Sequence, residues 1–186
     1  MHIGFALCGS FCTYNQVMPV MELLSRDYDL TPIFSHAAAT IDTRFGSAAD
    51  HIAQATEICG KKPLTTIAQA EPIGPQKLFD ALIIAPCTGN TLAKLAHSIA
   101  DTPVTMAAKS HLRNGRPVIL AISSNDALGG GAENIGKLLV RKHIYFVPFG
   151  QDDPIGKPTS MIADFTRIPQ TLECALEGKQ VQPLLL

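Results

Sequence analysis

Short apolar runs alternate along this chain with longer segments in which apolar residues recur every three or four positions. The runs are bounded by glycine, proline or small polar residues, as expected of strands buried on both faces of a parallel sheet. They lie at residues 2–8, 30–34, 81–85, 117–122 and 143–147. Helical spacing predicts helices near residues 17–24, 48–58, 91–99, 104–114, 134–141 and 167–177. This alternation predicts one α/β domain over residues 1–186, a three-layer Rossmann or flavodoxin-like parallel sheet with helices on both faces.

Three segments depart from this regular alternation. Residues 64–67 predict a further short strand, and Gly129-Gly130-Gly131 predicts a hinge or lid. Residues 148–158 contain three prolines and two glycines, which favour irregular backbone. We therefore expect a long loop there, covering a substrate or a neighbouring protomer.

The chain is organised around the strand at residues 81–85 and the polar turn that follows it. Pro86 lacks a backbone donor and is expected to end the strand, and a helix begins soon after Gly89. In open α/β sheets this turn lies at the carboxyl edge, where ligands bind. Thr88, Asn90 and Thr91 offer hydroxyl and amide groups there, and the helix N-terminus offers free amides to an anion. The same residue types also cap helices without binding anything.

Composition excludes several classes of function. A formal net charge of -1 with 15 basic and 16 acidic residues gives no electrostatic case for nucleic acid. No apolar run is long enough to span a membrane, and we see no signal peptide. The five cysteines and six histidines are scattered without ligand spacing, so neither a disulfide framework nor a metal site is expected. We expect a cytoplasmic protein.

Two further strand ends carry candidate binding groups. The turn with Gly9 and Ser10 is neither a dinucleotide fingerprint nor a Walker loop, and it either holds an anion or caps the first helix. Asn125 follows the apolar strand at residues 117–122, just as Asn90 follows the apolar strand at residues 81–85. The side-chain amide of each asparagine can donate a hydrogen bond to a carboxylate of a ligand without adding charge. Alternatively, each amide stabilises its own turn.

An ordered set of motifs resembles one family, the homo-oligomeric flavin-containing cysteine decarboxylases. Pro86-Cys87-Thr88-Gly89-Asn90-Thr91 is similar to the family's Pro-Ala-Ser-Ala-Asn-Thr signature, and Ile99-Ala100-Asp101 to its continuation. Pro117-Val118-Ile119-Leu120-Ala121 resembles its Pro-Val-Val-Leu-Ala strand, with Asn125 at the asparagine of its Pro-x-Met-Asn motif. The resemblance covers nearly the first 150 residues in register.

The resemblance implies a bound FMN and a homo-oligomer built on trimers, with the cofactor between protomers. We predict that Asn90 and Asn125 are the catalytic residues, as neutral donors to carboxylates of the substrate. The positions that fall at flavin contacts are Gly9, Ser10, Ser35, Ala37, Thr88 and Thr105.

Two departures from the family pattern argue against cysteine decarboxylation. Residues 70–75 lack the family's histidine, and the segment at residues 151–153 replaces its substrate clamp. The chain is most similar to a branch that acts with a second, different chain, on which NAD(P) is expected. The resemblance to that branch implies a role in oxidising a dihydropyridine dicarboxylate to pyridine-2,6-dicarboxylate, in the mother cell of a sporulating bacterium. The alternatives are a stand-alone flavin decarboxylase or prenyl-flavin synthase, and a non-catalytic partner chain with a flavoprotein fold.

Overall fold

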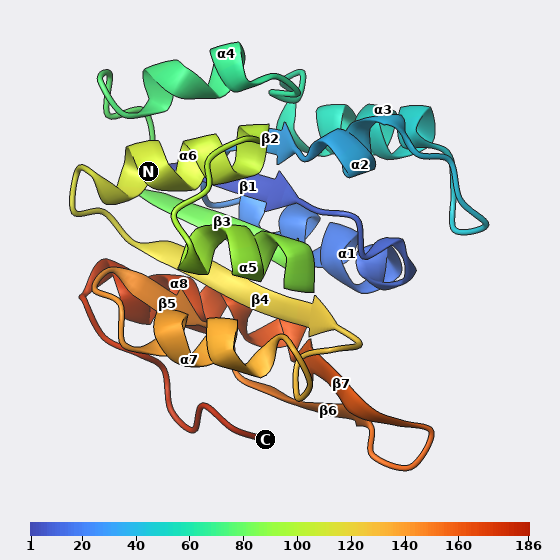
Figure 1. The fold of residues 1–186 in the computed structure, drawn as a ribbon. Helices are drawn as coiled ribbons and strands as arrows, with labels where there is room; N and C mark the ends of the chain where they lie inside the picture. The colour runs from blue at the N-terminus through green and yellow to red at the C-terminus, as the bar shows by residue number, and fades with distance from the viewer.

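The computed structural model describes residues 1–186 and places a seven-stranded sheet between two layers of helices (Figure 1). The strands are β1 (His2–Leu7), β2 (Asp29–Phe34), β3 (Ala81–Cys87), β4 (Val118–Ser124), β5 (Ile144–Phe146), β6 (Phe149–Asp153) and β7 (Lys157–Ala163). Their order is β2-β1-β3-β4-β7-β6, and β5 also pairs with β4. Strands β1 to β5 pair in parallel, as predicted, whereas β7 is antiparallel to both β4 and β6. The sheet is therefore mixed.

Helices cover both faces of the sheet, as expected of a flavodoxin-like fold. In Figure 1, α5, α6 and α7 lie on the near face, whereas α1 and α8 lie behind the sheet; α4 packs over α6, away from the strands. The helices are α1 (Tyr14–Ser25), α2 (His36–Thr40), α3 (Ala48–Cys59), α4 (Ile67–Ala70), α5 (Gly89–Ala96), α6 (Pro103–Leu112), α7 (Ala132–Leu139) and α8 (Ile168–Leu176). Three short 3₁₀ turns complete the set: η1 (Phe11–Thr13), η2 (Glu71–Ile73) and η3 (Phe165–Arg167). None of these helices is long and apolar enough to cross a membrane.

The central strands form the core because both of their faces are covered by helices. Every residue of β3 is buried, and so is every residue of β4 except Ser124. This is the environment that the continuous apolar runs predict. Gly60 and Gly115 follow α3 and α6 with φ of 64° and 66°, a left-handed conformation that glycine adopts without steric cost.

Two local predictions about strands are wrong. Residues 64–67 form only an isolated bridge between Leu64 and Ile33, and Ile67 already begins α4. Pro86 does not end the central strand, because β3 continues to Cys87 with a shift of its register against β4 after Ile84. The irregular pairing accommodates a residue without a backbone donor.

The predicted loop at residues 148–158 is instead most of a β-hairpin. Strands β6 and β7 pair from Phe149 opposite Ala163 to Asp153 opposite Lys157. Pro158 is tolerated because β4 pairs only with Met161 and Ile162, so the start of β7 lies beyond the edge of β4. Figure 1 shows the hairpin extending past the carboxyl end of β4.

The last residues of the chain pair with the hairpin. The Phe149 amide donates to the Leu184 carbonyl at 3.0 Å, and the Leu186 amide donates to the Phe149 carbonyl at 3.1 Å. The apolar tail thus covers part of the exposed edge of β6.

Candidate functional site

A cavity of about 800 Å³ lies at the carboxyl ends of β1, β3 and β4, under the β6–β7 hairpin. It contains five of the residues that the sequence singles out: Gly9, Ser10, Thr88, Asn90 and Asn125. Three separate strand-to-helix turns deliver these residues, since the parallel strands end at one edge of the sheet. The chain therefore gathers its polar turns into one site.

The first and third of these turns are joined by a hydrogen bond. The hydroxyl oxygens of Ser10 and Ser123 lie 2.7 Å apart, although 113 residues separate them in the sequence. Ser10 follows β1 and Ser123 lies near the end of β4, so the contact ties two of the polar turns together. Sequence reasoning missed Ser123 as a site residue. Its only signal was its place in a Ser-Ser-Asn-Asp strand end.

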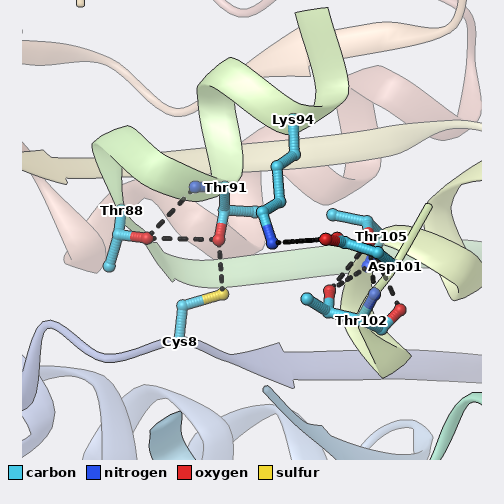
Figure 2. A network of polar contacts seen from close by, with 7 residues as sticks. All are labelled: Cys8, Thr88, Thr91, Lys94, Asp101, Thr102 and Thr105. Carbon is cyan, nitrogen blue, oxygen red and sulfur yellow. Dashed lines mark hydrogen bonds and ion pairs between the residues drawn. The ribbon is translucent and has the colours of Figure 1, made fainter. Parts of the chain in front are cut away.

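Thr88 fixes the start of α5 at the middle of the cavity. Its hydroxyl oxygen accepts a hydrogen bond from the Thr91 amide at 3.3 Å and donates to the Thr91 hydroxyl at 3.1 Å. Figure 2 shows the Thr91 hydroxyl placed between Thr88 and the Cys8 sulfur, to which it donates at 3.3 Å. Thr88 therefore acts as an N-cap and also lines the cavity.

The two buried cysteines of this region, Cys8 and Cys87, are poor nucleophiles. Burial raises the pKa of Cys8 to about 11, although the Thr91 hydroxyl partly opposes the shift. Burial, together with the neighbouring Cys8 thiol, raises the pKa of Cys87 well above its usual range. Both side chains are almost completely buried inside the sheet. Neither thiol lines the cavity, and both pack as small apolar groups.

The two asparagine side chains have no hydrogen-bond partner in the protein. Asn90 and Asn125 are both exposed at the cavity, and only the backbone carbonyl of Asn125 is used, by the Thr159 hydroxyl at 2.7 Å. The interpretation that each amide stabilises its own turn is therefore not supported by the contacts. Both amides are free to donate to a ligand.

The hairpin contributes two of the three charged side chains of the cavity. Lys157 is the one Lys or Arg among the lining residues, and its ammonium contacts the Asp152 carboxylate at 2.8 Å. This carboxylate raises the pKa of Lys157 above its usual value. Asp126 adds a second carboxylate from the turn after β4. Sequence reasoning missed Lys157 and Asp152 because proline and glycine make their segment resemble a loop.

Two aromatic rings border the cavity. Phe11 lies in η1, and Phe45, which is 46% exposed, lies in the segment between α2 and α3. The Arg44 guanidinium lies 4.8 Å from the centre of the Phe45 ring. Sequence reasoning missed both rings, since no periodic pattern marks residues in irregular segments. Together with Met161 and Ile162, they give the cavity its apolar surfaces.

The other three predicted flavin contacts lie outside this cavity. Ser35 caps α2 by accepting from the Ala38 amide at 3.2 Å. Ala37 is adjacent to the cavity wall, because a Cβ added at Gly9 would fall 3.3 Å from the Ala37 Cβ. Thr105 is only 1% exposed and forms a capping box with Thr102 at the start of α6 (Figure 2). Within one chain, Ser35 is therefore the N-cap of α2, and Thr105 completes the capping box of α6.

The donor set of the cavity fits a flavin mononucleotide. Hydroxyls, amides and the N-terminus of α5 suit a phosphate and a polyhydroxyl chain, and the Phe rings suit a planar ring system. A side chain at Gly89 would place its Cβ 2.6 Å from the Ser124 hydroxyl oxygen, so this hydroxyl would have to rotate away. No group of three His, Cys, Asp or Glu side chains is arranged to hold a metal ion.

Comparison with known proteins gives a consistent result. Residues 1–150 match the model of the family described as Flavoprotein. The chain is 45% identical to the B subunit of dipicolinate synthase from Bacillus subtilis (strain 168) over 185 residues, which cover 99% of this chain and 92% of that protein. A crystal structure of the corresponding B subunit from Bacillus halodurans has a TM-score of 0.91 and 45% identity, covering 100% of this chain and 95% of that one.

A more distant structure shares the fold. A dodecameric FMN-dependent Ubix-like decarboxylase from Escherichia coli O157:H7 matches with a TM-score of 0.62 and 24% identity, covering 80% of each chain. The flavodoxin-like arrangement is thus common to both branches.

Proposed function

Since the chain belongs to the Flavoprotein family, we propose that it is the flavin-binding B subunit of a dipicolinate synthase. It would help to oxidise a dihydrodipicolinate-type precursor to pyridine-2,6-dicarboxylate, together with the A subunit of that enzyme, which would carry NAD(P). The observation that carries this proposal is the single cavity in which Gly9, Ser10, Thr88, Asn90 and Asn125 come together. The similarity to a known B subunit over nearly the whole chain supports it.

Gly9, Ser10 and Thr88 are the residues that would hold FMN. The free amides of helix N-termini and the serine and threonine hydroxyls bind phosphate without a cationic side chain. A bound flavin supplies the capacity to accept a hydride. Ser123 would keep the Ser10 hydroxyl in place through their 2.7 Å contact.

Asn90, Asn125 and Lys157 would orient a dicarboxylate substrate. The two free amides donate to carboxylate oxygens, and Lys157 supplies the one positive charge at the cavity. Holding both carboxylates fixes the ring relative to the cofactor, which lowers the entropic part of the barrier. Cys8 and Cys87 have raised pKa values and do not line the cavity, so neither is assigned as a general acid or base.

The proposal is tested by reconstitution of the two-chain enzyme. The purified chain and the A subunit are combined with NAD(P)⁺, FMN and freshly made dihydrodipicolinate, and pyridine-2,6-dicarboxylate is quantified. Asn90→Ala is expected to raise the KM for the precursor by roughly tenfold or more, since a hydrogen bond to a charged group contributes about 1.5–3 kcal/mol. The matched control is Asn15→Ala, an exposed asparagine that does not line this cavity.

Other outcomes select the alternatives. Full activity with a Ser10→Ala variant that binds no flavin would make the chain a non-catalytic partner of the A subunit. Release of carbon dioxide from a cysteine-ended substrate, or prenylation of flavin, by the chain alone would make it a stand-alone enzyme.

A further inference from the structure

A second pocket lies at the opposite end of α5 from the cavity described above. It has a volume of about 300 Å³. The C-terminal ends of α5 and α6 border it, and so does Arg141, which lies just after α7. It shares no lining residue with the first cavity. Its lining residues are Leu95, Ser98, Ile99, Ala100, Thr105, Lys109, Leu112, Arg113 and Arg141.

Every charged side chain of this pocket is a base. Lys109, Arg113 and Arg141 line it, and no Asp or Glu does. Eight of the 15 Lys and Arg residues of the chain pair with a carboxylate within 4.0 Å, and seven do not. Three of those seven unpaired bases meet in this one pocket, in a protein whose net charge is -1.

The helix dipole accounts for only part of this cluster. Lys109 and Arg113 lie at the C-terminal end of α6, where a positive charge is favourable. However, they are four residues apart on one helix, and like charges at that spacing repel each other. Arg141 adds a third positive charge from a different element. An anion in the pocket would remove this repulsion.

Arg141 is held in place by the backbone of α5. Its Nη1 atom donates to the Leu95 carbonyl at 2.9 Å, and the same carbonyl also accepts from the Ser98 amide at 3.1 Å. The other guanidinium donors remain available, and a guanidinium presents them in a planar fork that matches two oxygens of one oxyanion. The apolar side chains of Leu95, Ile99 and Leu112 form the rest of the wall.

We propose that this pocket is a second binding site, for a small oxyanion that carries two or more negative charges. A phosphate group and a dicarboxylate share this chemistry. The Arg113 and Arg141 guanidinium groups bind the oxyanion through paired hydrogen bonds, and Lys109 adds a compact positive charge. Within one chain this pocket shares no lining residue with the flavin and substrate cavity, and none of its three bases is assigned to flavin or substrate.

Two probes at constant ionic strength test the inference and distinguish the sources. Inorganic pyrophosphate and succinate are titrated separately into the full chain saturated with FMN, and binding is followed by calorimetry and by NMR shifts of the Lys109 and Ser98 amides. We expect saturable binding of at least one probe at the second pocket. The double variant Lys109→Gln/Arg113→Gln is expected to raise its Kd at least tenfold.

Lys62→Gln and Lys142→Gln provide the control, because both lysines are unpaired bases that do not line the pocket. The Kd of each control variant for the bound probe is expected to stay within twofold of the wild-type value. The inference is overturned if neither probe binds saturably, or if the control and pocket variants lose affinity equally. It is also overturned if light scattering shows that the double variant changes the oligomeric state, since the bases would then serve a contact between protomers.

Discussion

His111 lies in the protein interior with one ring nitrogen that has no hydrogen-bond partner. The residue is 1% exposed, and its Nε2 atom is the unpaired one. Burial, and secondarily the positive charge of Arg116, lowers the pKa of His111 to about 4. Asp80, which lies 3.7 Å from Arg116, opposes the shift only partly. The folded protein therefore favours the neutral imidazole.

This histidine is predicted to make the protein sensitive to acid. Between pH 6.5 and pH 4 the unfolded chain binds the proton and the folded chain does not, so the free energy of unfolding falls as the pH falls through that range. The full loss is roughly 3 kcal/mol, at about 1.4 kcal/mol for each pKa unit. Urea unfolding at pH 7 and pH 4.5 measures it. His111→Gln should flatten the pH dependence; an unchanged slope would contradict this assignment.

The thiols should differ sharply in reactivity. Cys12 is exposed, whereas Cys8 and Cys87 are buried and have raised pKa values. At pH 8, brief treatment of the native protein with a maleimide should modify Cys12 and leave Cys8 and Cys87 intact, as read by peptide mass spectrometry. Unfolding in urea should make all of them reactive. Rapid modification of Cys8 in the native protein would show that the first strand is open to solvent.

Contacts between distant residues were the least predictable at this scale. Thr88 and Asn90 could be proposed because they follow a buried strand in the sequence, and their place at the cavity follows from that order. The Ser10–Ser123 contact depends on the distance between two strand ends, which no local pattern encodes. Lys157 is a further example, because its approach to the cavity depends on how the hairpin folds back.

At the scale of elements, Gln180 replaces a missing strand beside β5. Its side chain accepts from the Phe146 amide at 2.8 Å and donates to the Phe146 carbonyl at 2.7 Å. Phe146 is fully buried, so these backbone groups have little access to water.

Loss of the Gln180 side chain is therefore predicted to be costly. Gln180→Ala leaves a buried donor and acceptor without partners, and should lower the free energy of unfolding by about 1–3 kcal/mol. Gln182→Ala is the matched control, since Gln182 is exposed and its side chain makes no hydrogen bond within the chain. Chemical denaturation compares the two. Equal stability of both variants would mean that water satisfies Phe146 as well as Gln180 does.

The N-cap of α5 gives a second prediction for an element. Thr88→Ala removes the hydrogen bond to the Thr91 amide and should cost about 1 kcal/mol of stability, whereas Thr88→Ser keeps the accepting oxygen and should cost less. Thermal unfolding of the two variants measures the difference. If Ser and Ala are equally destabilising, the threonine methyl group rather than the cap is what matters.

The parallel strands were predictable and the hairpin was not, for one physical reason. Strands such as β3 and β4 are buried on both faces, so their sequences are continuously apolar. The hairpin is largely exposed and carries Asp152, Pro154, Gly156 and Pro158, which are typical of loops. Its strand character comes from backbone pairing with β4 and between its own arms. That tertiary pairing overrides local preference.

At the scale of the whole molecule, several apolar side chains remain exposed on the single chain. Val140 and Ile155 are 85% and 95% exposed, and Leu128 and Leu139 are each more than 40% exposed. We predict a homo-oligomer built on trimers, so light scattering should give a mass that is a multiple of three times 19.9 kDa. A monomer at micromolar concentration would contradict this prediction. It would also exclude a flavin site between protomers.

We predict that the cavity at the carboxyl edge of the sheet binds FMN. The most direct test is a visible absorption spectrum of the purified protein after incubation with FMN and gel filtration. Wild-type protein and a Ser25→Ala control, which alters an exposed contact on α1, should retain flavin bands near roughly 370 and 450 nm. Ser10→Ala should weaken binding about tenfold. FMN binding at this cavity would be contradicted if the wild-type protein retained no flavin. It would also be contradicted if the Ser10→Ala and Ser25→Ala variants bound FMN with equal affinity.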